Sequence, residues 1–173
     1  MESSRRLGRA WIVAAISSCL GPPGCGSSAP LPSDASRRTD LAEDAAQSRD
    51  IRATIDAFLT DPASGDPQKI MRFAIDSPDV TVVFRKSILE AEGASEDLQA
   101  LMLAAFTAGN VRAQLEAGKR EDMPAPGVRG MLAVYKKLKA RKPDLLVELY
   151  ETYAAKEAEG TLDAFVAERA QKE

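Results

Sequence analysis

Apolar residues recur with a helical period along most of the chain from residue 40 onward. Ile51, Ile55, Phe58 and Leu59 are three, four or one positions apart, which places them on one face of a helix. Later stripes have similar spacing: Ile70, Met71, Phe73 and Ala74; Val128, Met131, Leu132, Tyr135 and Leu138; Leu145, Leu146, Leu149, Tyr150 and Tyr153; and Leu162, Phe165 and Val166. The pattern predicts an all-α domain of six or seven helices.

Capping and turn residues indicate where these helices begin and end. Helices begin at side chains that cap the first turn or at prolines, and they end at glycines or before prolines. The expected starts are Asp66-Pro67, Ser77-Pro78-Asp79, Ser95, Pro143-Asp144 and Thr161, and the expected ends are Gly118, Lys142-Pro143 and Gly160. Residues 123–127, which contain two prolines, are expected to separate two helices.

The segment VTVVFRKSILE, residues 80–90, allows two interpretations. Its first five residues have β propensity. A lone strand would leave backbone donors and acceptors unpaired, and no other segment of the chain offers it a partner. We therefore predict a helix.

Residues 97–118 are the most apolar long stretch and predict a central helix. Gly109 lies inside it, where glycine is about 1 kcal/mol less favourable than alanine. A close crossing with another helix would explain this glycine better than a ligand site. Short connections favour helices packed as a compact bundle, and a short HEAT-like stack of helix pairs is the alternative.

The N-terminal residues follow a different pattern. Arg5, Arg6 and Arg9 precede the apolar run 11–16, an order that secretory signals share. The run is shorter than the roughly 20 residues that a membrane-spanning helix needs. The stretch Ile16-Ser17-Ser18-Cys19 resembles the lipobox of bacterial lipoprotein precursors: an aliphatic residue, two small residues and then a cysteine.

This resemblance implies a signal peptide over residues 1–18, lipid modification of Cys19, a flexible tether over 19–39 and a helical domain over 40–173. It also implies a lipid anchor in a bacterial envelope membrane. Leu20 replaces the aspartate that retains such proteins in the inner membrane, so the outer membrane is expected in a Gram-negative host. Cys25 fits the motif less well because Pro22, Pro23 and Gly24 precede it. The alternative is an N-terminal helix that packs into the core with two incidental cysteines.

Charge and composition narrow the partners. The chain has a net charge of −3, and the chain without residues 1–18 has 20 basic and 25 acidic residues, a net charge of −5. An acidic domain is poorly suited to nucleic acid. Residues 25–39 are rich in Ser, Pro, Ala and Gly and have few residues able to fill a core, which is typical of a tether.

Several chemistries are excluded by missing residue types. The chain has no histidine, which removes the commonest general base and metal ligand. Residues 40–173 contain no cysteine, no Ser-x-x-Lys and no Gly-x-Ser-x-Gly sequence, and no glycine-rich phosphate loop. We assign no catalytic, cofactor-binding or metal-binding residue and do not expect an enzyme.

Carboxylates are the main reactive groups that remain. Glu90, Glu92, Glu96 and Asp97 cluster around the turn before the central helix. Carboxylates can form glycosidase or calcium sites, but the EF-hand spacing is absent. Acidic residues at a helix start usually interact with the helix dipole and with solvent. We interpret the cluster in that way.

Basic and tyrosine residues form two further groups. The basic run consists of Lys136, Lys137, Lys139, Arg141 and Lys142, and the tyrosines are Tyr135, Tyr150 and Tyr153. Cations are favoured at a helix C-terminus, and contact with anionic headgroups or an acidic partner is the alternative. We expect the tyrosine rings in the core with their hydroxyls at its rim; an exposed groove lined by them would be the first place to look for a ligand.

These observations favour a non-enzymatic, lipid-anchored interaction or structural module with a possible envelope protein partner. The alternatives are a small-molecule or peptide binder with a pocket between helices and, last, a carboxylate-based enzyme. An exposed apolar patch would support the first function, a closed apolar cavity the second, and convergent carboxylates in a cleft the third.

Overall fold

A computed structural model describes the backbone of residues 34–172 and the side chains from residue 46 to residue 172. The predicted signal peptide, Cys19 and Cys25 lie outside the described residues. The described helices are α1 (Asp34–Thr60), α2 (Pro67–Asp76), α3 (Lys86–Leu89), α4 (Glu96–Ala117), α5 (Pro124–Arg141), α6 (Glu148–Ala158) and α7 (Leu162–Ala170). No strand occurs over residues 34–172, and the all-α prediction is confirmed.

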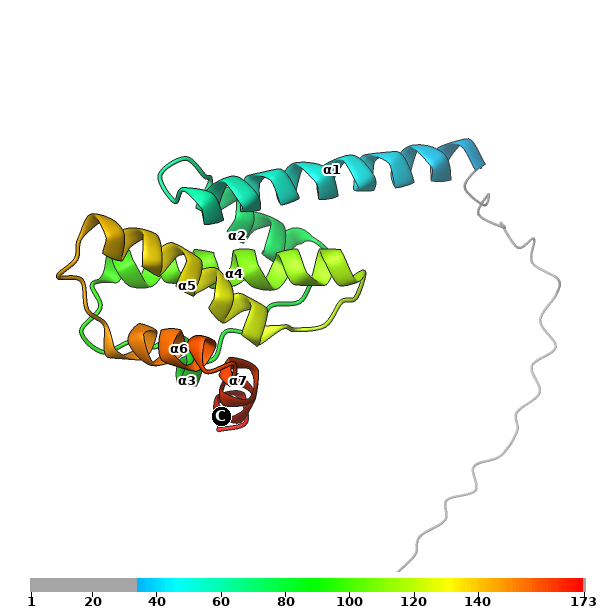
Figure 1. Ribbon diagram of the computed structural model, residues 1–173. Coiled ribbons are helices and arrows are strands. Elements are labelled where there is room, and N and C mark those ends of the chain that lie inside the picture. Colours follow the sequence, from blue (N-terminus) through cyan, green and yellow to red (C-terminus); the bar gives the residue numbers. More distant parts are fainter. Residues whose placement is uncertain (1–33, 173) are drawn as a thin grey trace, which may run out of the picture. The chain divides into compact units, whose positions relative to one another are not determined.

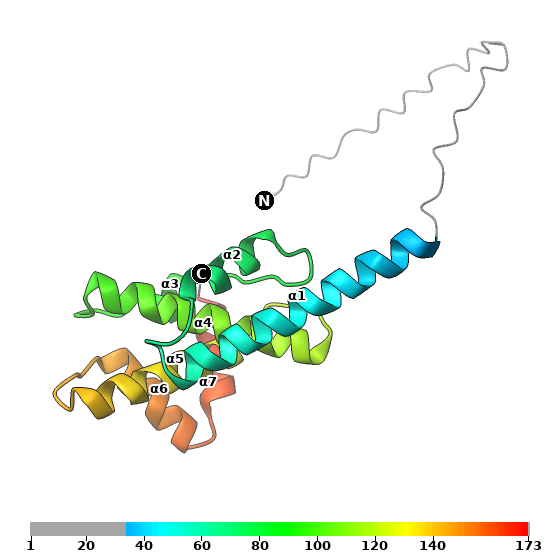
Figure 2. The ribbon, with the colours of Figure 1, turned by 90° about the horizontal axis from the view of Figure 1, so that it is seen from above.

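The antiparallel pair α4 and α5 forms the centre of the fold (Figure 1). The helices α1 and α2 pack on one side of this pair, and α3, α6 and α7 lie on the other side (Figures 1 and 2). In a solenoid each repeat would contact only its neighbours. Here α4 contacts four other helices and α5 contacts α1, α4, α6 and α7, so the molecule is a compact bundle around one core.

The central crossing depends on two glycines. Gly109 of α4 faces Gly130 of α5 so closely that a Cβ added to Gly109 would overlap the carbonyl oxygen of Pro126 and lie 3.1 Å from the Cα atom of Gly130. A Cβ added to Gly130 would overlap the carbonyl oxygen of Ala105. The expected close crossing at Gly109 is therefore confirmed.

Several predicted helix ends are also confirmed. The Asp66 carboxylate accepts a hydrogen bond from the Lys69 N–H at 3.0 Å, and the Ser95 hydroxyl accepts one from the Leu98 N–H at 3.3 Å. Gly118 and Gly160 end α4 and α6 with φ angles of 60° and 72°, which glycine adopts without a Cβ clash.

The prediction of a helix over residues 80–90 is wrong. Residues 80–85 form neither helix nor strand, Arg85 at their end has extended backbone angles, and only Lys86–Leu89 form a short helix; we call residues 80–85 the extended segment. The hydroxyl of Ser77 accepts a hydrogen bond from the Asp79 N–H at 3.2 Å, so the Ser-Pro-Asp sequence makes a turn rather than a helix start. Side chains of other elements then satisfy the backbone of the extended segment.

Three helix boundaries also differ from the predictions. The helix α5 begins at Pro124, within the stretch expected to be a linker, because prolines are tolerated in a first turn. The helix α6 begins at Glu148 rather than at Asp144, and Thr161 precedes α7 without a side-chain capping bond. The helix α1 reaches back to Asp34, before the domain boundary expected at residue 40.

Candidate functional site

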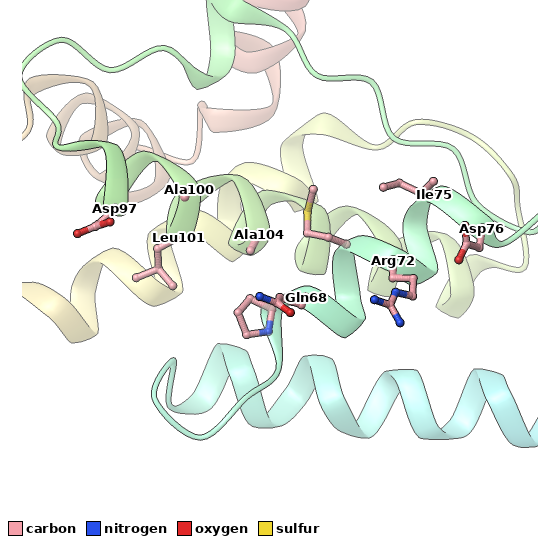
Figure 3. A pocket seen from close by; sticks show the side chains of 10 residues that line it. Gln68, Arg72, Ile75, Asp76, Asp97, Ala100, Leu101 and Ala104 are labelled. Carbon is pink, nitrogen blue, oxygen red and sulfur yellow. The ribbon is translucent and has the colours of Figure 1, made fainter.

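The most exposed large apolar side chain of the described residues is Ile75, in the last turn of α2. It is 76% exposed, and it borders a groove between α2 and the first half of α4 (Figure 3). We call this the Ile75 groove; its lining residues are Pro67, Gln68, Met71, Arg72, Ile75, Asp76, Asp97, Ala100, Leu101 and Ala104. The groove has a volume of about 670 Å³ and opens to solvent.

The Ile75 groove is apolar in the middle and charged at both ends. Met71 and Leu101 are half-buried between the two helices. Figure 3 shows Asp97 at one end of the groove and Asp76 at the other, with Arg72 beside α1. This arrangement can bind an apolar surface and provides carboxylates for polar groups at its ends.

A second groove lies on the other side of the exposed residue Ala100. We call it the Phe84 groove; its lining residues are Phe84, Arg85, Lys86, Leu89, Glu90, Gln99, Ala100 and Leu103, and its volume is about 350 Å³. Phe84 is 46% exposed, and its ring lies 6.4 Å from the ring of buried Phe106. Because both grooves include Ala100, they form one surface across α4, which we call the open face.

The extended segment that carries Phe84 is held by the side chain of Gln114. The Thr81 N–H donates to Gln114 Oε1 at 2.9 Å, and Gln114 Nε2 donates to the Thr81 carbonyl at 2.7 Å. A side-chain amide thus replaces the peptide group that a neighbouring strand would supply. Gln114 is itself buried, and its Nε2 also lies 2.6 Å from Asn110 Oδ1.

Asp122 holds the same segment from the loop between α4 and α5. Its carboxylate accepts hydrogen bonds from the Val83 N–H at 3.2 Å and from Asn110 Nδ2 at 2.8 Å, and it forms an ion pair with Arg85 at 2.5 Å. These bonds fix Phe84 at the rim of its groove. The charge of Arg85 is balanced by Asp122.

The structure distributes the predicted carboxylate cluster instead of bringing it into one cleft. Asp97 lines the Ile75 groove, Glu90 lines the Phe84 groove, and Glu96 is exposed in the first turn of α4. Glu90 and Glu92 also border a polar hollow with Glu148. Among the residues with described side chains, no group of three or more potential ligands could hold a metal ion.

The three predicted core tyrosines are buried, so the open face is not lined by them. The Tyr153 hydroxyl donates to the Ile88 carbonyl at 2.9 Å, and the Tyr135 hydroxyl donates to Glu151 at 2.6 Å. The prediction that the hydroxyls lie at the rim of the core is wrong for Tyr150, whose hydroxyl is buried and has no hydrogen-bond partner among the described residues. Burial raises the pKa of Tyr150 and that of Tyr153 to about 12, so both remain protonated at neutral pH.

The predicted basic run serves partly in ion pairs. Lys139 pairs with Glu151, and Arg141 pairs with Asp61 at 3.0 Å. Lys136 and Lys137 are exposed on α5 around a shallow hollow that also includes two alanines. The run therefore divides into contacts that join helices and exposed cations.

The sequence analysis missed Ile75, Phe84 and Ala100 as surface residues. A signal for Ile75 exists: relative to Ile70 and Phe73 it falls on another face of α2, so an apolar side chain there lacks a place in the core. No comparable signal marks Phe84, because its exposure depends on an extended segment held by distant side chains.

Comparison with known proteins gives no match: no family model, curated protein or solved structure matches this chain. Within residues 34–172, no helix has both the length and the hydropathy that crossing a membrane requires. The site must therefore be interpreted from its own geometry.

Proposed function

We propose that the protein is a lipid-anchored, non-enzymatic interaction module of the bacterial cell envelope. In this proposal Cys19 carries the lipid, and the Ile75 groove binds a protein partner. The observation that carries the proposal is the 76% exposure of Ile75 beside an apolar groove. Exposed apolar surface next to polar rims is typical of protein interaction sites.

The shape of the groove favours a protein partner over a small molecule. Small-molecule sites usually enclose 70–90% of the ligand surface. The Ile75 groove opens to solvent and has one of its largest side chains projecting from the rim. The exposed carboxylates Glu90, Glu92 and Glu96 are solvated and are not arranged around a buried reaction centre, which supports a binding role.

The order of residues 1–19 supports the anchor. A positive segment, a short apolar run and the lipobox-like Ile16-Ser17-Ser18-Cys19 follow one another as in lipoprotein precursors. A single acyl chain binds membranes only marginally. The diacylglyceryl group and further acyl chain that lipoprotein maturation adds would give stable anchoring.

The anchor is tested by comparing Cys19→Ser with Cys25→Ser in a bacterium. We expect Cys19→Ser to lose lipid labelling and membrane association and Cys25→Ser to keep both. Fractionation and metabolic lipid labelling measure the two properties. Membrane association and labelling that persist in Cys19→Ser would disprove the anchor.

The binding role is tested with a photo-crosslinking residue placed at Ile75 in the full chain in the same cells. Leu146 provides a matched control because it is 73% exposed but lies outside the groove. We expect a discrete protein product from position 75 and none from position 146. Equal or absent crosslinking at the two positions would contradict the proposed function.

A further inference from the structure

The open face has the form of a helix crossing site. Ala100 is small and exposed on α4, and a groove lies on each side of it. Close approach over a small residue, with larger side chains entering grooves on both sides, is how helices pack across one another. The molecule uses the same device internally where α4 and α5 cross at Gly109 and Gly130.

The Ile75 groove also favours a helix over an extended peptide. Its two walls are α2 and α4, in which backbone groups are used within the helices, so an added strand would find few free backbone partners. The α2 wall spans residues 67–76, which is about 14 Å at 1.5 Å per residue. This wall is long enough to receive the width of a crossing helix, about 10 Å, and such a helix would present apolar residues at i, i+3 or i+4, and i+7 to the two grooves.

The charges around the open face are mainly negative. Asp76, Asp97 and Glu90 line the grooves, and Glu96 lies one helical turn before Ala100 on the same side of α4. Within the described residues, none of these four carboxylates forms an ion pair. Arg72 and Lys86, which form no ion pair with any described side chain, lie among them, as does Arg85, which is paired with Asp122.

This charge distribution selects among the possible occupants. A second copy of the chain would bring four unpaired carboxylates but only two unpaired cations from each side, which is less favourable than a basic partner. The anionic headgroups of a membrane surface would be repelled in the same way. A helix that carries Lys or Arg beside its apolar stripe would pair with the free carboxylates.

We propose that the open face binds a basic amphipathic α-helix of another envelope protein, which crosses α4 over Ala100. One apolar side chain of that helix enters the Ile75 groove, another enters the Phe84 groove, and its basic residues contact Glu96 and Asp97. This inference rests on the proposed function and adds the chemical class of the partner.

The crossing is tested by photo-crosslinking from both grooves in the full, lipid-anchored chain. A benzoylphenylalanine replaces Ile75 in one variant and the exposed Gln99 of the Phe84 groove in the other. We expect the same partner from both positions, crosslinked within one segment that has apolar residues at helical spacing and an excess of Lys and Arg. Mass spectrometry of the crosslinked peptides identifies the segment.

Several results would overturn this inference. They are a product of twice the mass of the chain, a lipid adduct, an acidic or neutral segment, or different partners at the two positions. A partner captured from position 75 but not from position 99 would also show that the partner helix does not cross α4, while leaving the proposed function intact. Failure of both positions would remove the proposed function as well.

The charge requirement is tested separately at position 75. We expect Glu96→Gln combined with Asp97→Asn to lower the crosslinking yield at least fivefold. Glu121→Gln is the matched control, because Glu121 is an exposed carboxylate in the loop after α4, outside both grooves. Equal yields from the double variant and the control, at equal protein levels, would show that the carboxylates do not select the partner.

Discussion

The open face and the side formed by α5, α6 and α7, which we call the α5–α7 side, differ in how many of their charged side chains form ion pairs. On the α5–α7 side Arg129 bridges Glu157 at 3.2 Å and Asp163 at 2.9 Å, and Lys139 pairs with Glu151. Those pairs join helices to one another. On the open face the carboxylates beside Ala100 have no ion-pair partner among the described residues, and an isoleucine is left in solvent. The charges named on the α5–α7 side are paired within the chain, whereas those beside Ala100 are available to a partner.

Both regions depend on the α4–α5 crossing, and breaking it should have the largest effect. Helix propensity alone predicts that Gly109→Ala stabilises the protein by about 1 kcal/mol. The added methyl would instead overlap the Pro126 carbonyl and separate the two helices. Because the overlapped atom belongs to the backbone, we expect a loss of about 3 kcal/mol, the upper end of the usual cost of overpacking, in the free energy of unfolding measured by urea denaturation.

The sign of this change is the decisive result. A stabilised Gly109→Ala variant would mean that α4 and α5 lie farther apart than the structure shows. A destabilised variant in which the open face and the α5–α7 side unfold together would confirm that one core supports both.

The next largest loss of stability is expected at the two hydrogen bonds between Gln114 and the Thr81 backbone, which we call the clip because they hold the extended segment that carries Phe84. Gln114→Leu removes the bonds to the Thr81 N–H and carbonyl and leaves both groups without partners. We expect a loss of about 2–3 kcal/mol and faster hydrogen exchange at the Thr81 amide. Gln68→Leu, at an exposed position on α2, is the control and should change stability little. Unchanged exchange in Gln114→Leu would contradict the clip.

This clip also explains where sequence analysis succeeded and failed for the fold. Helices such as α2 and α4 can be predicted from local sequence, because an apolar stripe follows a capping residue such as Asp66 or Ser95. The conformation of the extended segment cannot be predicted from its neighbouring residues. Its partners, Gln114 and Asp122, come 33 and 39 residues after the backbone groups they bind. Their pairing becomes visible only when α4 is packed.

The candidate site could be predicted only in part for a related reason. The acidic residues before the central helix stand out in the sequence, and Glu90 and Asp97 do border the grooves. Whether Ala100 is buried or exposed depends on which helices cover it. The sequence pattern places α2 and α4 in a bundle but does not determine the gap between them.

A matched pair of tyrosines tests how completely the α5–α7 side satisfies its polar groups. Tyr153→Phe removes the hydroxyl that donates to the Ile88 carbonyl, so we expect a loss of about 1 kcal/mol. Tyr150→Phe removes a buried hydroxyl that has no partner in the part of the chain that the structure describes, so we expect no loss or a small gain. Thermal or urea denaturation distinguishes the two. A larger loss in Tyr150→Phe would indicate an additional hydrogen bond at that hydroxyl.

Glu151, on the α5–α7 side, should make the stability of the protein modestly dependent on pH. Hydrogen bonds from Lys139 and Tyr135 lower the pKa of Glu151 below its ordinary value of 4.5. A lowered folded-state pKa stabilises the protein above the unfolded-state value, and this stabilisation is lost as pH falls through the folded-state pKa. Between pH 6 and pH 3 the melting temperature should therefore fall less steeply in Glu151→Gln than in the wild type. Equal slopes in Glu151→Gln and the wild type would contradict a stabilising role of the Glu151 carboxylate.

The smallest effect is expected where the open face is most exposed. Ile75→Lys replaces an apolar side chain that already lies in solvent, so the free energy of unfolding should change by less than about 0.5 kcal/mol. Ile70→Lys, one and a half turns earlier in α2, places a charge at a fully buried position and should destabilise the protein severely. Urea denaturation of the two variants compares the free energies of unfolding for a charge on the buried side and on the exposed side of α2. A loss above about 1.5 kcal/mol in Ile75→Lys would mean that Ile75 packs against the bundle, and the groove would then lack the exposed apolar surface from which its binding role is inferred.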